Sequence, residues 1–181
     1  TDGQIKRLYA DGTIGISPYW SGLLNPCSYD VRLGDKFRVY DTQLQSAVST
    51  VHTVPQMTLV TVEPGQTFDL PPGGFALAET REKVRLPASI LARFEGKSTL
   101  GRYGLMTHVT AGFIDPGFTG TITLELHNVS PVTIKLQPWQ RIGQLAFELL
   151  STPVSLPYYD TGRYDRQSGP TPPKPLGVDR N

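Results

Sequence analysis

Cysteine, histidine and long apolar runs are all scarce in this sequence of 181 residues. Cys27 is the only cysteine, which excludes an intrachain disulfide and a cysteine-rich zinc site. The three histidines, His52, His108 and His127, lack the HxxxH and HxH spacings that favour a structural metal site. No apolar run approaches the roughly 20 residues that a membrane-spanning helix needs. We therefore expect neither zinc nor a membrane partner.

An excess of charge is also missing. The formal net charge is +1, and like charges never form a long block, so a general nucleic-acid surface is not expected. Local basic residues could still bind a small polyanion. The opening TDGQIKRLYADG is polar and has no apolar core of the kind that signal peptides carry. These features together predict a cytoplasmic protein.

Glycine and proline, in contrast, are abundant, with 18 Gly and 16 Pro. Short runs such as MTLVTVEPG, TFDLPPGG, FALAET and EKVRLP alternate with turn signals, and VTIKL and RIGQLAFELL supply further strands. SYDVRLGD is followed by FRVY after an expected turn. This spacing predicts an all-β sandwich or barrel rather than a parallel α/β sheet. We expect one domain over residues 1–169 and a Pro-rich tail over 170–181 that is extended or disordered.

Two regions carry helix signals. Thr1 and Gln4 have the spacing of a capping box, which predicts a short N-terminal helix that ends near Gly12. The stretch SILARFEGKSTLGRYGL contains helix formers on both sides of EGK, so we expect two short helical pieces that flank a turn. The rest of the chain is expected to be strands and turns.

Glu125 is the first candidate for chemistry. It lies in GTITLELHN, where Ile122, Leu124 and Leu126 should face the core and Glu125 the opposite side. From the alternation alone, a solvent-facing strand residue is the more common outcome. A partly buried glutamate at the rim of a pocket could instead act as a general base.

Asp115 is the second candidate, in the loop TAGFIDPGFTG. Asp-Pro-Gly fits a tight turn, in which Asp accepts a local hydrogen bond and Gly takes a positive φ. Gly112, Gly117 and Gly120 would also let another molecule approach the backbone closely. The loop can therefore be a turn only, or a turn that also forms the wall of a nucleotide pocket.

Three other polar stretches could bind an anion. GKSTLGR offers Lys97, the Ser98 and Thr99 hydroxyls and Arg102 to phosphate oxygens, although an ordinary capped helix fits as well and GxxxxGK[ST] is absent. Gln144 in RIGQL could contact a phosphate or be a satisfied core glutamine. YYDTGRYDRQSGP could be a mobile lid or a solvated tail.

The order of these stretches resembles that of the dCTP deaminases, members of the trimeric dUTPase-like superfamily. The resemblance rests on NPCSYDVRLGD, EGKSTLGRYGL, THVTAGFIDPGFTGTITLELHN, QPWQRIGQLAF and the closing GRYDRQSGP. It is most specific between Glu95 and Leu126. It implies a distorted, jelly-roll-like β-barrel with short helices, assembled as a homotrimer with nucleotide sites near the subunit interfaces.

The resemblance also implies roles for single residues. Glu125 matches the catalytic acid/base, and Ser98 and Arg102 match residues that orient water, carboxylate and base. The backbone that reads the pyrimidine edge matches His108, Val109, Thr110 and Ala111. Positions that contact the triphosphate or close over it match Lys97, Gln144, Tyr158, Arg163 and Gln167. Zinc deaminases carry an HxE…PCxxC signature that this sequence lacks, so a side chain would have to activate the water.

The loop around Asp115 bears on the product. It resembles the AGxID loop of dUTPases and of bifunctional deaminases that release dUMP, rather than the THRIDPGW type of enzymes that stop at dUTP. In the former, the Asp assists attack on the α-phosphate with Mg²⁺ bound to the triphosphate. We therefore expect a bifunctional enzyme acting on dCTP and dUTP, with Mg²⁺ held through phosphates and waters.

Alternatives stay open at this point. A deaminase that releases dUTP, a dUTP diphosphatase and a non-catalytic nucleotide-binding regulator all fit the same scaffold, and dTTP is a candidate inhibitor by analogy with relatives. Cys27 stands where Ser is more usual, and Arg163 where Lys is more common. The Gly-rich C-terminal arm of dUTPases is missing, which weakens a pure dUTPase interpretation.

Overall fold

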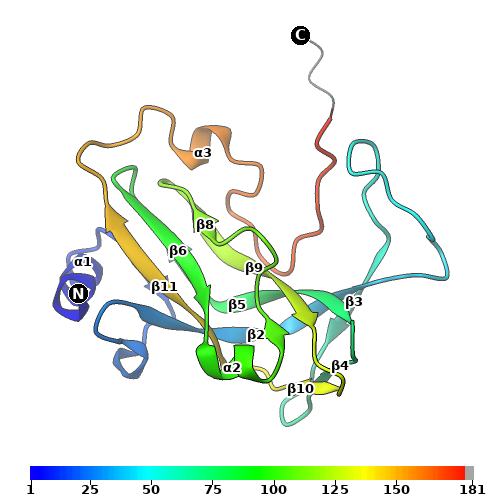
Figure 1. The fold of residues 1–181 in the computed structure, drawn as a ribbon. Coiled ribbons are helices and arrows are strands. Elements are labelled where there is room, and N and C mark those ends of the chain that lie inside the picture. Colours follow the sequence, from blue (N-terminus) through cyan, green and yellow to red (C-terminus); the bar gives the residue numbers. More distant parts are fainter. Residues whose placement is uncertain (178–181) are drawn as a thin grey trace.

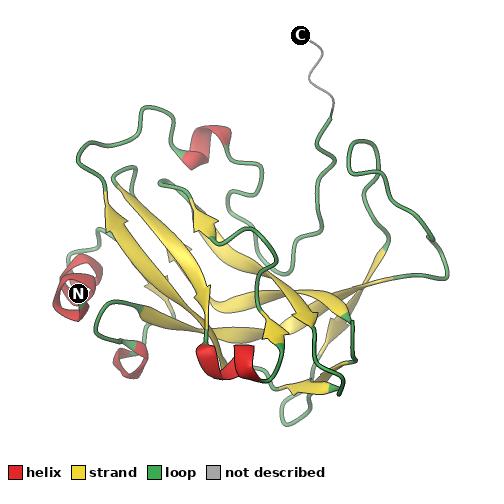
Figure 2. Cartoon of the chain, in the orientation of Figure 1, coloured by secondary structure: helices red, strands yellow, loops and turns green. Residues whose placement is uncertain are grey.

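The computed structural model describes residues 1–177, which form a curled antiparallel sheet with short helices at its margins (Figures 1 and 2). The elements in chain order are α1 (Asp2–Ala10), β1 (Gly15–Ser17), η1 (Ser21–Leu23), β2 (Tyr29–Tyr40), β3 (Met57–Thr61), β4 (Phe68–Leu70), β5 (Phe75–Arg85), β6 (Ile90–Gly96), α2 (Ser98–Arg102), β7 (Leu105–Met106), β8 (Phe113–Ile114), β9 (Thr119–Asn128), β10 (Ile134–Leu136), β11 (Arg141–Leu149) and α3 (Tyr158–Thr161). The prediction of a mainly β fold with short helices is confirmed.

Nine strands of the described chain belong to one sheet, in the order β7-β9-β5-β2-β11-β6-β8, with β1 beside β5 and β3 beside β2. A separate pair joins β10 to β4. The long strand β2 links the two halves, because its beginning pairs with β11 and its end pairs with β5 and β3. In Figure 1 it crosses the molecule beneath β6 and β11. Sharing one strand between two halves lets the sheet curl around its core.

The curl coincides with irregularities that the sequence pattern did not reveal. The expected turn between SYDVRLGD and FRVY is wrong, since both belong to β2, whose register against β5 shifts between Leu33 and Phe37. FALAET and EKVRLP likewise share β5 up to Arg85, with a shift between Glu79 and Lys83 against β9. Such bulges bend a strand without ending it.

A buried ion pair satisfies the polar groups at this bend. The Glu82 side chain is fully buried and accepts hydrogen bonds from the Arg32 backbone amide and from Arg32 Nε, both at 2.7 Å. The Thr80 hydroxyl donates to the Glu82 carbonyl (2.7 Å) and accepts from the Ile122 amide (2.9 Å). The bulged residues of β5 are therefore tied to both β2 and β9, because buried polar groups need such partners.

The predicted alternation in β9 is confirmed. Ile122, Leu124 and Leu126 are buried in the core, whereas Thr121, Thr123, Glu125 and His127 on the other face are only partly buried. The core side packs against aromatic residues of neighbouring strands, including the stacked rings of Phe37 and Phe68, whose centroids are 4.1 Å apart. The alternation leaves the opposite face of β9 available for polar side chains.

The N-terminal helix is also confirmed: α1 has the capping box between Thr1 and Gln4. The expectation of two helical pieces around EGK is wrong in its first half. Residues Ile90–Gly96 form β6, which pairs with β11 from Leu149 to Gly143, and only Ser98–Arg102 is helical. Pairing along a whole strand overrides the weak helix preference of this stretch. Among residues 1–177, every helix is too short or too polar to span a bilayer.

The first part of the Pro-rich tail lies against the domain. The Pro170 carbonyl accepts a hydrogen bond from Arg38 Nε (2.9 Å), and the Leu176 amide donates to the Thr50 carbonyl (2.9 Å). Thr50 belongs to the long connection between β2 and β3, which reaches out from the sheet in Figure 1. Residues 178–181 of the predicted tail lie outside the described residues.

Candidate functional site

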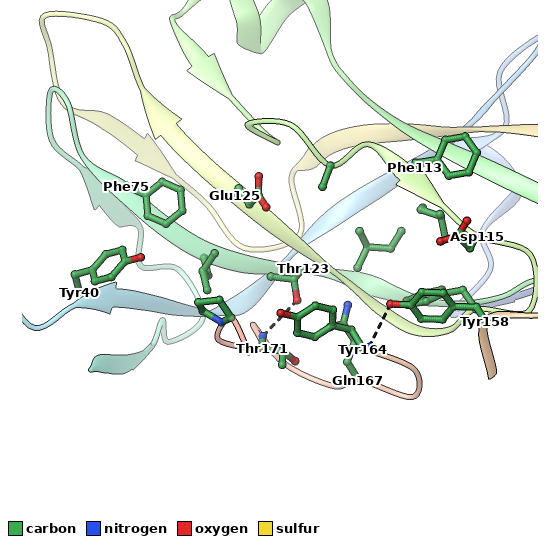
Figure 3. A pocket seen from close by; sticks show the side chains of 16 residues that line it. Tyr40, Phe75, Phe113, Asp115, Thr123, Glu125, Tyr158, Tyr164, Gln167 and Thr171 are labelled. Atoms are coloured by element: carbon green, nitrogen blue, oxygen red, sulfur yellow. Dashed lines mark hydrogen bonds between the residues drawn. The ribbon is translucent and has the colours of Figure 1, made fainter. Parts of the chain in front are cut away.

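A cavity of about 420 Å³ opens between the sheet and the C-terminal segment (Figure 3). Its floor comes from β5 and β9, one wall from residues 111–118, and its roof from residues that follow β11. The lining residues used below are Phe75, Leu77, Ala111, Asp115, Thr123, Glu125, Tyr158, Tyr164, Gln167, Thr171 and Pro173. We call this space the main cavity. Its lining joins apolar surface to a small set of polar groups, as is common in ligand sites.

Glu125 projects from β9 into the main cavity. In Figure 3 it lies between Phe75 on one side and Asp115 on the other. Its Oε2 accepts a hydrogen bond from the Val109 backbone amide at 2.9 Å. Of the two possibilities that the alternation left open, the structure has the cavity-facing one. An amide that donates to one carboxylate oxygen fixes the orientation of the group and leaves the other oxygen free for a ligand or water.

Asp115 lies in a loop that is both a turn and a cavity wall. The Phe118 amide donates to the Asp115 carbonyl (3.2 Å), and Gly117 has a φ of +91°, as the Asp-Pro-Gly pattern predicts. The Asp115 side chain also lines the main cavity. A Cβ at residue 117 would lie 2.9 Å from Pro157 Cβ and from the Tyr158 amide nitrogen, so glycine is needed for the close approach of the C-terminal segment.

Tyr158 faces Asp115 from the start of that segment. Its phenolic oxygen accepts a hydrogen bond from the Tyr164 amide (3.2 Å), and its ring packs edge-on against Phe118. Burial raises the pKa of the Tyr158 phenol above its ordinary value, and the negative charge of Asp115 adds to the rise. Tyr158 is therefore neutral at physiological pH and can donate a hydrogen bond to an anion in the cavity.

The residues of the His108–Ala111 connection are divided between several roles. Ala111 lines the main cavity, and Val109 holds Glu125. The His108 ring packs edge-on against Phe94, with the ring centroids 5.9 Å apart, and its Nδ1 is buried with no hydrogen-bond partner among the described residues. Thr110, which lies between Val109 and Ala111 in the chain, does not line the main cavity. The backbone of this connection thus runs along one side of the Glu125 carboxylate.

Five of the predicted residues lie away from the main cavity within one chain. They lie at the N-cap of α2, in α2 itself and in β11, and they are Lys97, Ser98, Thr99, Arg102 and Gln144. Lys97 Nζ pairs with Asp30 Oδ1 at 2.8 Å, and Gln144 Oε1 accepts from the Ser28 hydroxyl at 2.8 Å. Within a single subunit, α2 therefore does not contribute to the lining of the main cavity.

Asp30 organises this second polar group, and sequence reasoning did not single it out. Its buried carboxylate binds Lys97, Arg141 Nη1 (3.2 Å) and Asn25 Nδ2 (2.7 Å). The signal that could have identified it is a carboxylate inside the apolar strand pattern SYDVRL, because buried carboxylates need partners. Asp30 holds two cationic side chains in fixed positions beside α2.

The C-terminal residues divide in the same way. Tyr158 and Gln167 line the main cavity. Arg163 points elsewhere: its Nη2 donates to the carbonyls of Lys174 (3.0 Å) and Pro175 (2.6 Å). Tyr40, Phe75 and Tyr164, which the sequence analysis did not select, also line the cavity. In the sequence, nothing distinguishes an aromatic residue that lines a cavity from one that packs in the core.

Carboxylates that could meet a cation are few at this site. Asp115 and Glu125 are the acidic side chains in the cavity lining. Within residues 1–177, no three His, Cys, Asp or Glu side chains are grouped closely enough to hold a metal ion. Two carboxylates in a mostly apolar cavity suit a hard cation that would keep most of its ligands on phosphates and water.

Comparisons with known proteins identify relatives of this chain. The family model described as "dCTP deaminase-like" matches residues 1–150. Three curated relatives carry the name "dCTP deaminase, dUMP-forming". The protein from Beutenbergia cavernae is 45% identical, over 94% of this chain and 91% of its own. The one from Clavibacter michiganensis subsp. michiganensis is 48% identical (94% and 87%), and the one from Corynebacterium glutamicum strain R is 46% identical (96% and 94%).

A solved structure shows the same fold. The crystal structure of 2'-deoxycytidine 5'-triphosphate deaminase from Agrobacterium tumefaciens superimposes with a TM-score of 0.65 at 23% identity. The match covers 82% of this chain and 46% of the Agrobacterium chain. The family match, the relatives and the shared fold lead to one conclusion: the chain belongs to the dCTP deaminase-like family.

Proposed function

We propose that this protein deaminates dCTP and releases dUMP, in the overall reaction dCTP + 2 H₂O → dUMP + ammonia + diphosphate. The observation that carries the proposal is that two carboxylates, Glu125 and Asp115, line one cavity. One can serve attack on the pyrimidine and the other attack on a phosphate. The names of the relatives, which are 44–48% identical, support the same product.

In the first half of the reaction, Glu125 is the general base. It takes a proton from a water that attacks cytosine C4 and delivers this proton to N3; it then takes the proton of the new C4 hydroxyl and delivers it to the amino group, which leaves as ammonia. The Val109 amide holds the carboxylate in a fixed orientation for both transfers. We assign Ser98 to holding the water and Arg102 to fixing the carboxylate, as the resemblance implies. The backbone from His108 to Ala111 would read the pyrimidine edge.

In the second half, Asp115 assists the attack of water on the α-phosphate. Mg²⁺ bound to the triphosphate would neutralise phosphate charge, and Asp115 is the cavity carboxylate that can meet it directly or through water. Tyr158 and Gln167 are available to phosphate oxygens from the roof, whereas Lys97, Thr99 and Gln144 would contact the triphosphate from α2 and β11. Arg163 would reach the nucleotide only after it leaves the Lys174 and Pro175 carbonyls.

Product analysis tests the proposed function. Purified protein incubated with dCTP and Mg²⁺ should release ammonia, dUMP and diphosphate in equal amounts, as measured by anion-exchange chromatography and an ammonia assay. Accumulation of dUTP without diphosphate would support the deaminase that stops at dUTP. Formation of dUMP from dUTP but no ammonia from dCTP would support a dUTP diphosphatase, and nucleotide binding without turnover would support a regulator.

The fact that α2 does not line the main cavity within one chain is relevant to how subunits assemble. Ser98 and Arg102 do not line the cavity of their own chain, yet the proposed chemistry needs them beside Glu125. We infer a homotrimer in which α2 of one subunit completes the cavity of its neighbour. Inhibition by dTTP and a cytoplasmic location remain predictions.

A subunit-mixing experiment tests the shared site. Homotrimers of Ser98→Ala and of Glu125→Gln should each be inactive, because every site lacks one group. Co-refolding the two in equal amounts should restore about a quarter of the wild-type activity, since about one interface in four then combines intact Ser98 with intact Glu125. Mixing Ser98→Ala with Arg102→Ala is the matched control and should restore nothing. Failure of the first mixture to recover, in trimers shown to be mixed, would mean that both groups act within one chain.

A further inference from the structure

We propose that Glu79 is a positioning residue that holds the C-terminal segment over the main cavity before any nucleotide binds. The inference rests on the proposed function and adds to it a residue that does not contact the substrate. We call residues 164–173 the roof segment, because Tyr164, Gln167, Thr171 and Pro173 form the roof of the cavity. Figure 3 shows this segment crossing below the β9 residues Thr123 and Glu125.

The roof segment begins by pairing with the beginning of β9. The Arg166 amide donates to the Thr119 carbonyl at 2.6 Å, and the Thr121 amide donates to the Gln167 carbonyl at 3.1 Å. The Gln167 side chain adds a hydrogen bond from Nε2 to the Thr121 carbonyl (2.8 Å). The contact is close, because a Cβ on Gly120 would lie 2.8 Å from the Gln167 carbonyl oxygen. These contacts fix the first part of the segment through backbone groups.

Beyond Gln167, side chains of the sheet bind the backbone of the roof segment. Glu79 on β5 and Thr123 on β9 are directly paired across the two strands. Glu79 Oε2 accepts from the Gly169 amide at 2.7 Å, and Thr123 Oγ1 accepts from the Thr171 amide at 3.3 Å. Two positions along the same strands, Leu77 is paired with Glu125. Residues two apart on a strand share a face, so Glu79 attaches the roof on the same face of the sheet that carries the proposed general base.

The surroundings of Glu79 are suited to a carboxylate that holds the roof segment through a hydrogen bond. The residue is only 8% exposed, and within residues 1–177 no basic side chain lies within ion-pair distance of it. A buried carboxylate without a cation depends on hydrogen-bond donors. The adjacent position on β2 is Gly34, where a Cβ would lie 2.8 Å from Glu79 Cγ. Gly34 leaves room for the Glu79 side chain to reach the Gly169 amide.

The consequence for the enzyme is that the roof is ordered in advance. Without the Glu79 acceptor, dCTP would have to order the roof segment as it binds, and affinity would fall by that cost. The reacting groups would be unchanged once the nucleotide is in place. Loss of Glu79 should therefore act on KM and leave kcat largely intact.

Three variants test this role: Glu79→Ala, which removes the acceptor, Glu79→Gln, which keeps an acceptor oxygen, and Glu63→Ala, a matched exposed glutamate on a turn. Trypsin can cleave after Arg163 and Arg166, which flank the start of the roof segment. In Glu79→Ala, cleavage at these sites should be about tenfold faster and the KM for dCTP about tenfold higher, as expected for one hydrogen bond to a charged group. Glu79→Gln, which keeps a neutral acceptor, should change both quantities less than Glu79→Ala does, and Glu63→Ala should behave like the wild type.

Several outcomes would overturn the proposal. They are an unchanged rate of cleavage, an unchanged KM, an equal loss in Glu79→Ala and Glu79→Gln, or faster cleavage at all basic residues rather than at Arg163 and Arg166. If the wild-type protein does not turn over dCTP, the proposed function fails. Cleavage of the unliganded variants would then still decide whether Glu79 holds the roof.

Discussion

The Glu125→Gln variant should lose deamination by about 10³-fold, the contribution typical of a general base. Glutamine has nearly the same shape and can still accept the hydrogen bond that the Val109 amide gives to Oε2 in the wild type. Its amide cannot take a proton from water or pass one to N3 and ammonia. The substitution therefore removes the proton transfers and keeps the local structure. Ammonia release from dCTP under single-turnover conditions measures the loss.

The control for this result is structural as well as kinetic. The far-ultraviolet circular dichroism, the oligomeric state and nucleotide binding of Glu125→Gln should match those of the wild type, and Glu63→Gln on an exposed turn should retain full activity. Ammonia release within tenfold of the wild-type rate would remove Glu125 from the role of base. A variant that fails to bind dCTP would show that Glu125 holds the substrate instead of activating water.

The Asp115→Asn variant should change the product rather than stop the first reaction. Asn keeps the turn, because the hydrogen bond of the turn goes to the backbone carbonyl of residue 115 and Asn is common at this turn position, but it has no charge with which to assist water or meet Mg²⁺. We expect diphosphate release to fall by about 10²-fold relative to ammonia release, an effect of the size found for other positioned groups of this kind, so that dUTP accumulates. Chromatography of the nucleotides over a time course measures the ratio.

Asp160→Asn is the matched control, because Asp160 lies on α3, close to Asp115 in the fold, and is exposed outside the cavity lining. It should release dUMP like the wild type. If Asp115→Asn still forms dUMP and diphosphate at the wild-type ratio, Asp115 is a turn residue only. Equal loss of ammonia and diphosphate would mean that Asp115 acts before deamination, in binding or in ordering the loop.

Local patterns were sufficient to predict much of the fold. The capping box before α1 and the alternation of β9 depend on neighbours in the sequence, and both are confirmed. The strand Ile90–Gly96 forms by pairing with β11, about 50 residues farther along the chain. The helix formers within it therefore led to a wrong prediction of a helix. The bulges of β2 and β5 are held by Arg32, Glu82 and Thr80, whose mutual contacts no period in the sequence reveals.

The part of the candidate site that lies in one continuous sequence motif could be predicted. Glu125 and Asp115 belong to a continuous stretch that resembles the family, and both line the main cavity. Glu79 lies in AETREKV, where charged residues alternate as on a solvated strand, and nothing in that pattern shows its burial. In the homotrimer that we propose, the positions of Lys97 and Gln144 relative to a nucleotide would depend on a neighbouring subunit, which sequence patterns do not arrange in space. Their roles therefore stay predictions.

The close approach at Gly117 has a mechanical consequence for the C-terminal segment. The Tyr158 amide binds the Pro116 carbonyl (2.8 Å) beside this glycine, while the far end of the segment binds Glu79 and Thr123. The segment over the main cavity is thus attached to the domain near both of its ends, with the pairing of Arg166 and Gln167 to β9 between them. Breaking the contact between the Tyr158 amide and the Pro116 carbonyl would move the Asp115 loop, whereas breaking the contacts with Glu79 and Thr123 would leave that loop in place. We therefore expect the contacts with Glu79 and Thr123 to be the ones that open, so that the Asp115 loop keeps its place while a ligand passes.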